Sequence, residues 1–235
     1  MVHMDNAAAP PLPCPQPWRT PDGAPNAGKT PTGSARIVDA DGAPGLLLPS
    51  RPTTVAAGVL LIVVGACFAV LGGLLIAGES VIGAVGGVVL GLLGVLLLAA
   101  GGFALRRKPR AVGIVLTPDH VVLNWLRPVV RLPWTSIIEI RPLALRMGRA
   151  RTAPTRNYLG VVCREPGVVD ERTRKAAARF GKDLACAVSM RSVDLDQLVV
   201  LHTLRFYLDN PPARAELAGE QAVVRVGAGR VTGTQ

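Results

Sequence analysis

Three clusters of basic side chains are the residues best suited to bind a ligand in this chain. The first is the run Arg106-Arg107-Lys108-Pro109-Arg110. The second has no acidic residue within it and consists of Arg141, Arg146, Arg149, Arg151 and Arg156. The third consists of Arg172, Arg174, Lys175, Arg179 and Lys182. Guanidinium and ammonium groups bind phosphates and carboxylates, so each cluster predicts contact with an anionic group.

The charge distribution narrows the choice of anion. Residues 106–235 carry 22 Lys and Arg against 11 Asp and Glu, a net charge of +11, whereas residues 1–54 carry four of each. Nucleic-acid binding would need basic residues interleaved with aromatic side chains that stack on nucleobases, or a helix that reads a groove, but Phe180 is the only aromatic residue within the segment of the third cluster. We therefore expect no nucleic acid and assign anionic lipid headgroups to the first two clusters. A purely topological role for the first cluster, and a solvated loop or an acidic protein partner for the second, stay open.

Catalytic and metal-binding patterns are not found in the sequence. The histidines His3, His120 and His202 are scattered, and the four cysteines Cys14, Cys67, Cys163 and Cys186 lack the spacing of metal ligands. No nucleophile motif, phosphate-binding loop or carboxylate pair stands out. The sequence predicts a protein that is not an enzyme and has no cofactor or metal site.

Two long apolar runs dominate the middle of the chain. Residues 55–77 and 81–105 each reach the length of about 20 residues that a membrane-spanning helix needs. Glu79 is the only charged residue in residues 55–105, and it lies at the break between the runs. The sequence therefore predicts a transmembrane hairpin within residues 51–110. Because bases flank both outer ends, we expect a multi-pass protein of the cytoplasmic membrane with both termini in the cytoplasm. The excess of Arg over Lys, 22 to 4, is typical of a GC-rich bacterial genome.

Glycine spacing predicts close helix packing. Gly58, Gly65 and Gly72 repeat every seven residues in the first run, and Gly83, Gly87 and Gly91 repeat every four in the second. Small residues at such spacing allow helix backbones to approach. The glycines could pack the two helices on each other or could associate separate hairpins. No Asp, Glu, Lys, Arg or His lies within either run, which argues against a transporter or channel.

The remaining residues divide into two tails and one domain. Residues 1–50 are rich in Pro, Ala and Gly, and we expect them to be disordered. Residues 111–218 predict a domain whose short segments rich in β-branched residues form strands at 113–117, 120–126, 129–132, 135–142, 157–163 and 184–190. A short helix is expected within 170–180. The final helix is expected to begin at an Asp194 N-cap, with Gln197 completing a capping box. Residues 219–235 are expected to form a flexible tail.

This order of elements resembles the pleckstrin-homology-like (PH-like) fold. The segments Gly113-x-x-Leu116-Thr117-Pro118-Asp119 and Leu132-Pro133-Trp134-Thr135-Ser136-Ile137 resemble motifs of bacterial PH-like domains. The stretch from Asp194 to Leu217 is similar to the closing helix of the STM3941-like family, bacterial membrane proteins of unknown function. The resemblance implies an α+β fold: a two-helix transmembrane hairpin followed by a PH-like, partly open β-barrel capped by a C-terminal α-helix.

Two functional hypotheses follow. In the first, the hairpin anchors a non-enzymatic cytoplasmic domain that docks on anionic lipid, on a protein partner or on both. In the second, glycine-mediated homo-oligomers of the hairpin form a membrane scaffold or minimal pore that the PH-like domain regulates.

Overall fold

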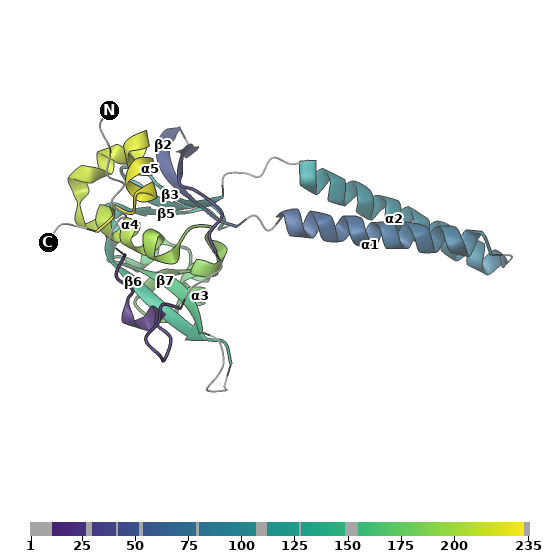
Figure 1. Ribbon diagram of the computed structural model, residues 1–235, viewed down its shortest axis with the longest axis horizontal. Coiled ribbons are helices and arrows are strands. Elements are labelled where there is room, and N and C mark those ends of the chain that lie inside the picture. Colours follow the sequence, from purple (N-terminus) through teal and green to yellow (C-terminus); the bar gives the residue numbers. More distant parts are fainter. Residues whose placement is uncertain are drawn as a thin grey trace, which may run out of the picture. The chain divides into compact units, whose positions relative to one another are not determined.

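The computed structural model describes residues 11–26, 30–40, 42–51, 54–78, 80–106, 112–126, 128–148 and 155–232. The chain forms two compact units, one from residues 52–110 and the other from residues 1–51 together with 111–235. Figure 1 shows the elements of both units. Each unit is described separately.

The first unit is a helical hairpin. Helix α1 (Thr54–Ile76) and helix α2 (Val81–Arg106) confirm the predicted bounds to within one residue at each end. Both are long enough and apolar enough to cross a membrane. Their outer surfaces expose large apolar side chains, such as Leu60 at 63% and Leu96 at 67%. A helix that is apolar on all sides is not adapted to contact water.

The second unit contains a five-stranded antiparallel sheet in the order β1-β2-β3-β4-β5. Its strands are β1 (Arg36–Ala40), β2 (Ala43–Pro49), β3 (Gly113–Leu116), β4 (His120–Leu123) and β5 (Val130–Pro133). Strand β2 pairs with β3, with Leu46 opposite Leu116 and Leu48 opposite Ile114. The helical hairpin is therefore inserted into the connection between two neighbouring strands of one sheet.

A three-stranded antiparallel sheet follows in the order β6-β7-β8. Its strands are β6 (Ile137–Arg146), β7 (Thr155–Cys163) and β8 (Leu184–Ser189). Helix α3 (Glu171–Ala177) connects β7 to β8 and begins at Asp170, whose carboxylate accepts hydrogen bonds from the amide and hydroxyl of Thr173. Ala177 and Phe180 pack with Val162 and Leu184, so the α3 segment covers one face of this sheet.

The C-terminal part consists of helix α4 (Gln197–Asp209), the 3-10 helix η5 (Pro211–Ala218) and helix α5 (Glu220–Gly227). The shorter 3-10 helices are η1 (Gln16–Trp18), η2 (Trp134–Ser136), η3 (Pro166–Val168) and η4 (Met190–Ser192). The main hydrophobic core joins the inner faces of both sheets to α4, through side chains that include Leu46, Leu116, Leu132, Leu159 and Leu201. The fold is α+β, as expected.

The barrel expectation requires a correction. The described residues form two open antiparallel sheets, and β5 is not paired with β6. The chain passes from one to the other through η2, where the Trp134 indole donates to the Thr117 carbonyl over 2.9 Å. This 3-10 turn interrupts the strand pattern, so the two sheets remain separate.

The predicted disordered tail is wrong for the described residues of 1–50; residues 1–10 lie outside the described part. Strands β1 and β2 belong to the sheet, and Leu46, Leu47 and Leu48 are each 0% exposed. Trp18 is also fully buried, and its indole nitrogen donates to the Leu143 carbonyl at 2.9 Å. The prediction failed because it averaged composition over a segment whose apolar residues bury against strands far along the chain.

A buried polar network also holds the N-terminal segment in place. The Asn157 amide donates to the Asn26 carbonyl at 3.2 Å and to the Gln197 side chain at 2.8 Å. Gln197 in turn donates to the Asn26 carbonyl at 2.6 Å. Because the Asn157 and Gln197 side chains are both buried, this network holds the N-terminal segment against β7 and α4.

Two C-terminal predictions are also corrected. Residues 219–232 are ordered, with α5 burying Ala222 and Val226 and with Val231 1% exposed. The N-cap of α4 is Asp196, whose carboxylate accepts from the Leu198 amide at 2.7 Å. Asp194 instead binds Thr32, through the Thr32 hydroxyl at 2.9 and 3.0 Å. Asp194 and Asp196 lie two residues apart and both could cap the helix, but Asp194 is engaged in tertiary contacts.

We expect the substitution Trp18→Ala to destabilise the second unit by about 3–5 kcal/mol, because it empties a fully buried aromatic site. Trp18→Phe keeps most of the ring but loses the hydrogen bond to Leu143, and should cost about 1–3 kcal/mol. Denaturant unfolding of the full chain, followed by near-UV circular dichroism, measures both. Equal stability of wild type and Trp18→Ala would mean that the N-terminal segment does not contribute to the core.

Candidate functional site

Glycines at seven-residue intervals line the contact between α1 and α2. A Cβ atom added to Gly72 would lie 2.6 Å from the Gly87 carbonyl oxygen, and one added to Gly65 would lie 2.8 Å from that of Gly94. At Gly101 an added Cβ would lie 2.8 Å from the Gly58 carbonyl oxygen. Real Cβ atoms do not approach backbone so closely, and the two helices therefore touch backbone to backbone. We call Gly58, Gly65, Gly72, Gly87, Gly94 and Gly101 the glycine seam.

The seam agrees only in part with the glycines singled out in the sequence. Gly87 lies in it, but a Cβ on Gly83 would come no closer than 3.4 Å to Leu75, and one on Gly91 would meet nothing within 4 Å. Gly94 and Gly101 were missed. The signal was available, because Gly87, Gly94 and Gly101 repeat the seven-residue interval of α1, which keeps residues on one helix face.

Other glycines lie away from the seam. A Cβ atom on Gly73, Gly86 or Gly102 would meet nothing within 4 Å. Packing of α1 on α2 within one hairpin thus accounts for the glycine seam. A Gly87→Leu substitution would disturb the hairpin itself, so it does not distinguish self-association from packing within one hairpin. Substitutions at the three open glycines do.

The ends of β2 and β3 form the joint at which the hairpin is inserted. The Ser50 amide donates to the Val112 carbonyl at 2.8 Å. The next residue, Arg51, donates from its amide to the Ser192 carbonyl at 2.8 Å, and its side chain donates to the Val193 carbonyl at 3.3 Å. The Arg51 guanidinium also lies 3.7 Å from the Asp194 carboxylate, which is only 11% exposed. The chain therefore leaves the domain at Arg51, which these contacts hold in place, and returns to it at Val112, which is hydrogen-bonded to Ser50.

The structure describes only some of the predicted lipid-binding residues. Arg107, Lys108, Arg110, Arg149 and Arg151, and the side chain of Arg106, lie outside the described part of the structure. Arg141 pairs with Glu139 at 2.6 Å and with Asp183 at 2.8 Å. The hydrogen bonds that Arg141 donates to Glu139 and Asp183 raise the pKa of Arg141, and the bond that Glu139 accepts from Arg141 lowers the pKa of Glu139. Arg141 is thus already neutralised locally.

Arg146 and Arg156 lie at the tip of the β6–β7 hairpin, where Arg146 is opposite Thr155 and Arg156 is opposite Leu145. Neither has a carboxylate partner among the described residues. Both are therefore available for an external anion.

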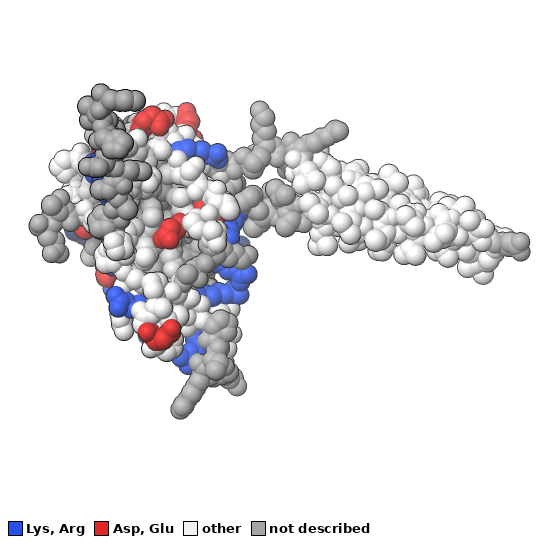
Figure 2. All heavy atoms as spheres, viewed as in Figure 1, with Lys and Arg blue, Asp and Glu red and all other residues white. Residues whose placement is uncertain are grey.

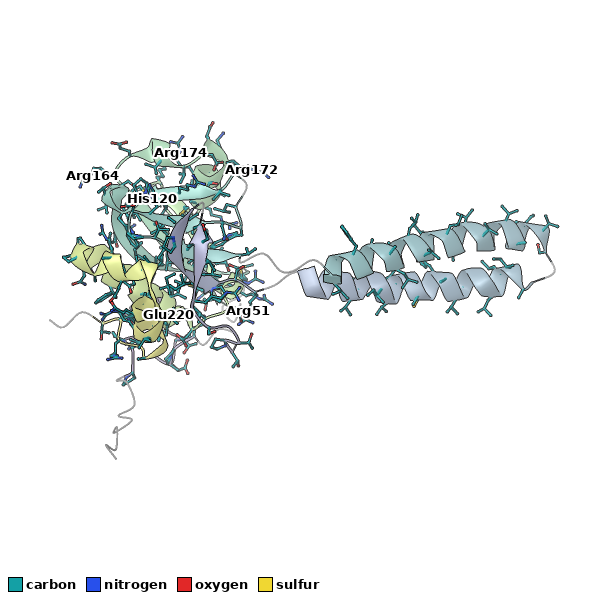
Figure 3. The ribbon with its side chains drawn as sticks, turned by 90° about the horizontal axis from the view of Figure 1, so that it is seen from above. Arg51, His120, Arg164, Arg172, Arg174 and Glu220 are labelled. Carbon is teal, nitrogen blue, oxygen red and sulfur yellow. The ribbon has the colours of Figure 1, made fainter. Side chains whose placement is uncertain are left out.

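The third basic cluster lies on and after α3. Lys175 pairs with Glu171 at 2.8 Å, and the Arg179 guanidinium lies 4.8 Å from the centre of the Phe180 ring. Figure 2 shows Lys and Arg side chains gathered along the end of the domain that carries α3 and the exit of the chain toward α1. Arg172 and Arg51 both lie toward this end, whereas Arg164 lies toward the other (Figure 3). In Figure 3 Arg172 and Arg51 nevertheless lie at opposite edges of the domain, so the third cluster is separate from the joint.

The histidines and cysteines do not assemble a reactive centre in the part of the chain that the structure describes. His120 lies in β4, and His202 contacts the Pro13 carbonyl at 2.8 Å. No group of three or more possible metal ligands occurs among the described residues. Burial raises the pKa of the Cys186 thiol to about 12, with the nearby Cys163 adding to the shift. This cysteine is therefore held as a thiol and is a poor nucleophile.

A polar cluster beneath α5 borders a surface pocket of about 390 Å³. Glu216 accepts from the Tyr207 hydroxyl at 2.8 Å and from Arg225 at 3.1 Å. Burial alone would raise the pKa of Glu216, but the hydrogen bonds from Arg225 and Tyr207 outweigh it and lower that pKa. Burial and the bond to Glu216 raise the pKa of Tyr207. Because these polar groups form hydrogen bonds with one another, the cluster stabilises the contact between η5 and α5.

Glu216→Gln is expected to destabilise the domain by about 1–2 kcal/mol at pH 7, since it weakens charge-assisted hydrogen bonds to partly exposed Arg225. The lowered pKa of Glu216 stabilises the fold above its ordinary value of 4.5, and this stabilisation is lost as the pH falls below it. The gap between wild type and variant should therefore narrow toward pH 3. Thermal unfolding at pH 7 and pH 3 measures it, with Arg230→Gln as an exposed control; a gap that widens in acid would contradict the assignment.

Comparisons with protein-family models, with curated proteins and with solved structures gave no match to this chain.

Proposed function

We propose that this chain is a non-enzymatic integral membrane protein whose hairpin anchors a cytoplasmic domain at the membrane surface. The observation that carries the proposal is the insertion of two apolar helices between β2 and β3 of that domain. Their exposed leucine, valine and isoleucine side chains would be costly in water, at about 25 cal/mol per Å² of apolar surface. In a bilayer the same surface is solvated by lipid, and the helices satisfy their own backbone groups.

The orientation follows from the flanking bases. Arg51 precedes α1, and Arg106, Arg107, Lys108 and Arg110 end or follow α2, whereas the turn contains Glu79. Basic flanks are retained in the cytoplasm, so both termini and the whole second unit would be cytoplasmic.

The domain itself is proposed to be PH-like. Support comes from the order of the elements, because the strands β2–β5 and β6–β8 are followed by α4, as in the strands with a closing helix that this resemblance implies. On this view β1, η5 and α5 are additions, and the hairpin interrupts the first strand connection.

The role of the domain is proposed to be docking on anionic lipid, with a protein partner as the alternative. Support comes from the +11 charge of residues 106–235 and from bases such as Arg146 and Arg156 that lack carboxylate partners in the described structure. Neutralisation of phosphates by such residues contributes about 1 kcal/mol per base near the surface.

Flotation with liposomes tests this role. The ligand-binding unit must include residues 1–51, so the appropriate protein is one in which a short turn replaces residues 52–111. Binding to cardiolipin-rich vesicles that fades at high salt, and no binding to neutral vesicles, is expected. Failure to bind anionic vesicles at low salt would exclude lipid docking and leave the basic surface to a protein partner.

A further inference from the structure

A tyrosine whose hydroxyl has no hydrogen-bond partner among the described residues lies near arginines on the outer face of the β6-β7-β8 sheet. Tyr158 is 8% exposed, and its ring lies 4.5 Å from that of Phe180. The Tyr158 hydroxyl has no hydrogen-bond partner among the described residues, yet it is not among their fully enclosed polar atoms. It therefore reaches the surface as a donor without an acceptor in the described part of the chain, which is unusual for so buried a side chain.

Three arginines lie next to this aromatic pair in the chain or in the strand register. Arg156 precedes Tyr158 by two residues and so lies on the same face of β7. Arg179 lies over the Phe180 ring at 4.8 Å. Arg191 is exposed in η4, which packs beside β7 directly after Ser189, the residue opposite Tyr158. We call Arg156, Tyr158, Arg179, Phe180 and Arg191 the aromatic-basic patch.

The acidic side chains nearest to the patch are engaged elsewhere. Glu171 pairs with Lys175, and Asp170 caps α3. Asp183 pairs with Arg141, and Asp194 binds Thr32 and Arg51. The three arginines have no carboxylate partner among the described residues, so the patch keeps a net positive charge.

One member of the patch, Arg191, lies beside the joint. It precedes Ser192, whose carbonyl accepts a hydrogen bond from the Arg51 amide. Only Pro52 and Thr53 separate Arg51 from the start of α1 in the chain.

From these observations we propose that the aromatic-basic patch is the surface through which the domain contacts anionic phospholipid. The arginines bind headgroup phosphates, the Tyr158 hydroxyl donates to a phosphate oxygen, and the partly exposed Phe180 ring contacts the interfacial region. Aromatic rings with a polar end, flanked by bases, suit this region. The inference rests on the proposed lipid-docking function. It assigns lipid contact to arginines that have no carboxylate partner among the described residues, in place of Arg141.

Photo-crosslinking in the full-length protein tests the patch. A benzophenone side chain replaces Ala178, which is exposed beside Arg179, in protein reconstituted into nanodiscs of phosphatidylcholine with or without phosphatidylglycerol. A second variant carries the probe away from the patch, at Val224, which is exposed in α5. Intact mass measures the lipid adducts. We expect phosphatidylglycerol adducts at Ala178 that decrease at high salt.

Matched charge variants then separate a site from general attraction. The triple variant R156Q/R179Q/R191Q should lower the adduct at Ala178 by tenfold or more, since each base changes the docked fraction by about fivefold. The variant R36Q/R164Q/R230Q removes the same charge from exposed positions elsewhere and should leave the adduct unchanged. Y158F should lower it severalfold while keeping the ring contact with Phe180. Far-UV circular dichroism checks that each variant is folded.

The outcomes distinguish this inference from the proposed function. Adducts at Val224 without adducts at Ala178 would overturn the patch but leave lipid docking intact. Equal losses in both triple variants would likewise overturn the patch, because charge alone would then be responsible. No phosphatidylglycerol-dependent adduct at either probe would overturn both.

Discussion

A chain in which a short Asn-Gly turn replaces residues 52–111 is expected to fold as a water-soluble domain, whereas residues 112–235 alone should remain unfolded. The ends to be joined are already adjacent, since the Ser50 amide donates to Val112 at 2.8 Å, and such turns connect antiparallel strands. Residues 112–235 lack Trp18 and Leu46–Leu48, all 0% exposed. Their loss removes about 6–12 kcal/mol of burial free energy, which is comparable to the whole stability of a domain.

Size-exclusion chromatography and near-UV circular dichroism of the two soluble proteins measure this difference. A matched control adds residues 11–51 as a separate peptide to residues 112–235, and partial recovery of the near-UV signal is expected. A cooperative unfolding transition for residues 112–235 alone would contradict the account, because it would make β1 and β2 dispensable.

Substitution in the glycine seam is expected to separate α1 from α2. In Gly94→Ala the new Cβ would lie 2.6 Å from the Ala69 amide nitrogen and 2.7 Å from the Gly65 carbonyl oxygen, and neither is able to rotate away. Overpacking of this kind costs about 1–3 kcal/mol per site. The double variant Gly65→Ala/Gly94→Ala should lose less than twice this amount, since both sites belong to one contact.

Energy transfer between dyes at the two outer ends of the hairpin, measured during SDS titration in mixed micelles, reports the separation. Gly102→Ala is the matched control, because its new Cβ would meet nothing within 4 Å. It should retain or raise stability, since alanine is the better helix former by up to about 1 kcal/mol. Equal midpoints for Gly94→Ala and Gly102→Ala would contradict the seam.

The parts of the fold that the sequence predicts are those whose signals are local. The bounds of α1 and α2 follow from apolar runs broken at Gly78-Glu79-Ser80. Most strands after the hairpin were expected for the same reason, because β-branched runs between turn residues are short-range patterns. The N-terminal strands were not, since Leu46–Leu48 gain their burial from β3, which follows more than sixty residues later.

The candidate site was predictable only at the level of charge. The sequence identifies Arg141 and Arg156 as members of one basic cluster, but it does not reveal that Arg141 pairs with Asp183 across the sheet. Nor does it bring Arg156, Arg179 and Arg191 to one face, because that requires the register of β7 with β8 and the return of the chain through α3. The aromatic pair Tyr158–Phe180 depends on the same register.

The central claim, a membrane hairpin inserted within one cytoplasmic domain, is tested most directly by cysteine labelling in spheroplasts. In a background without native cysteines, Ser80→Cys, Ala43→Cys and Ala178→Cys report the turn and both halves of the domain. A membrane-impermeant maleimide should label only Ser80→Cys in intact spheroplasts, and all three after permeabilisation. Labelling of Ala43→Cys or Ala178→Cys from outside, or release of the protein by alkaline carbonate, would contradict the account.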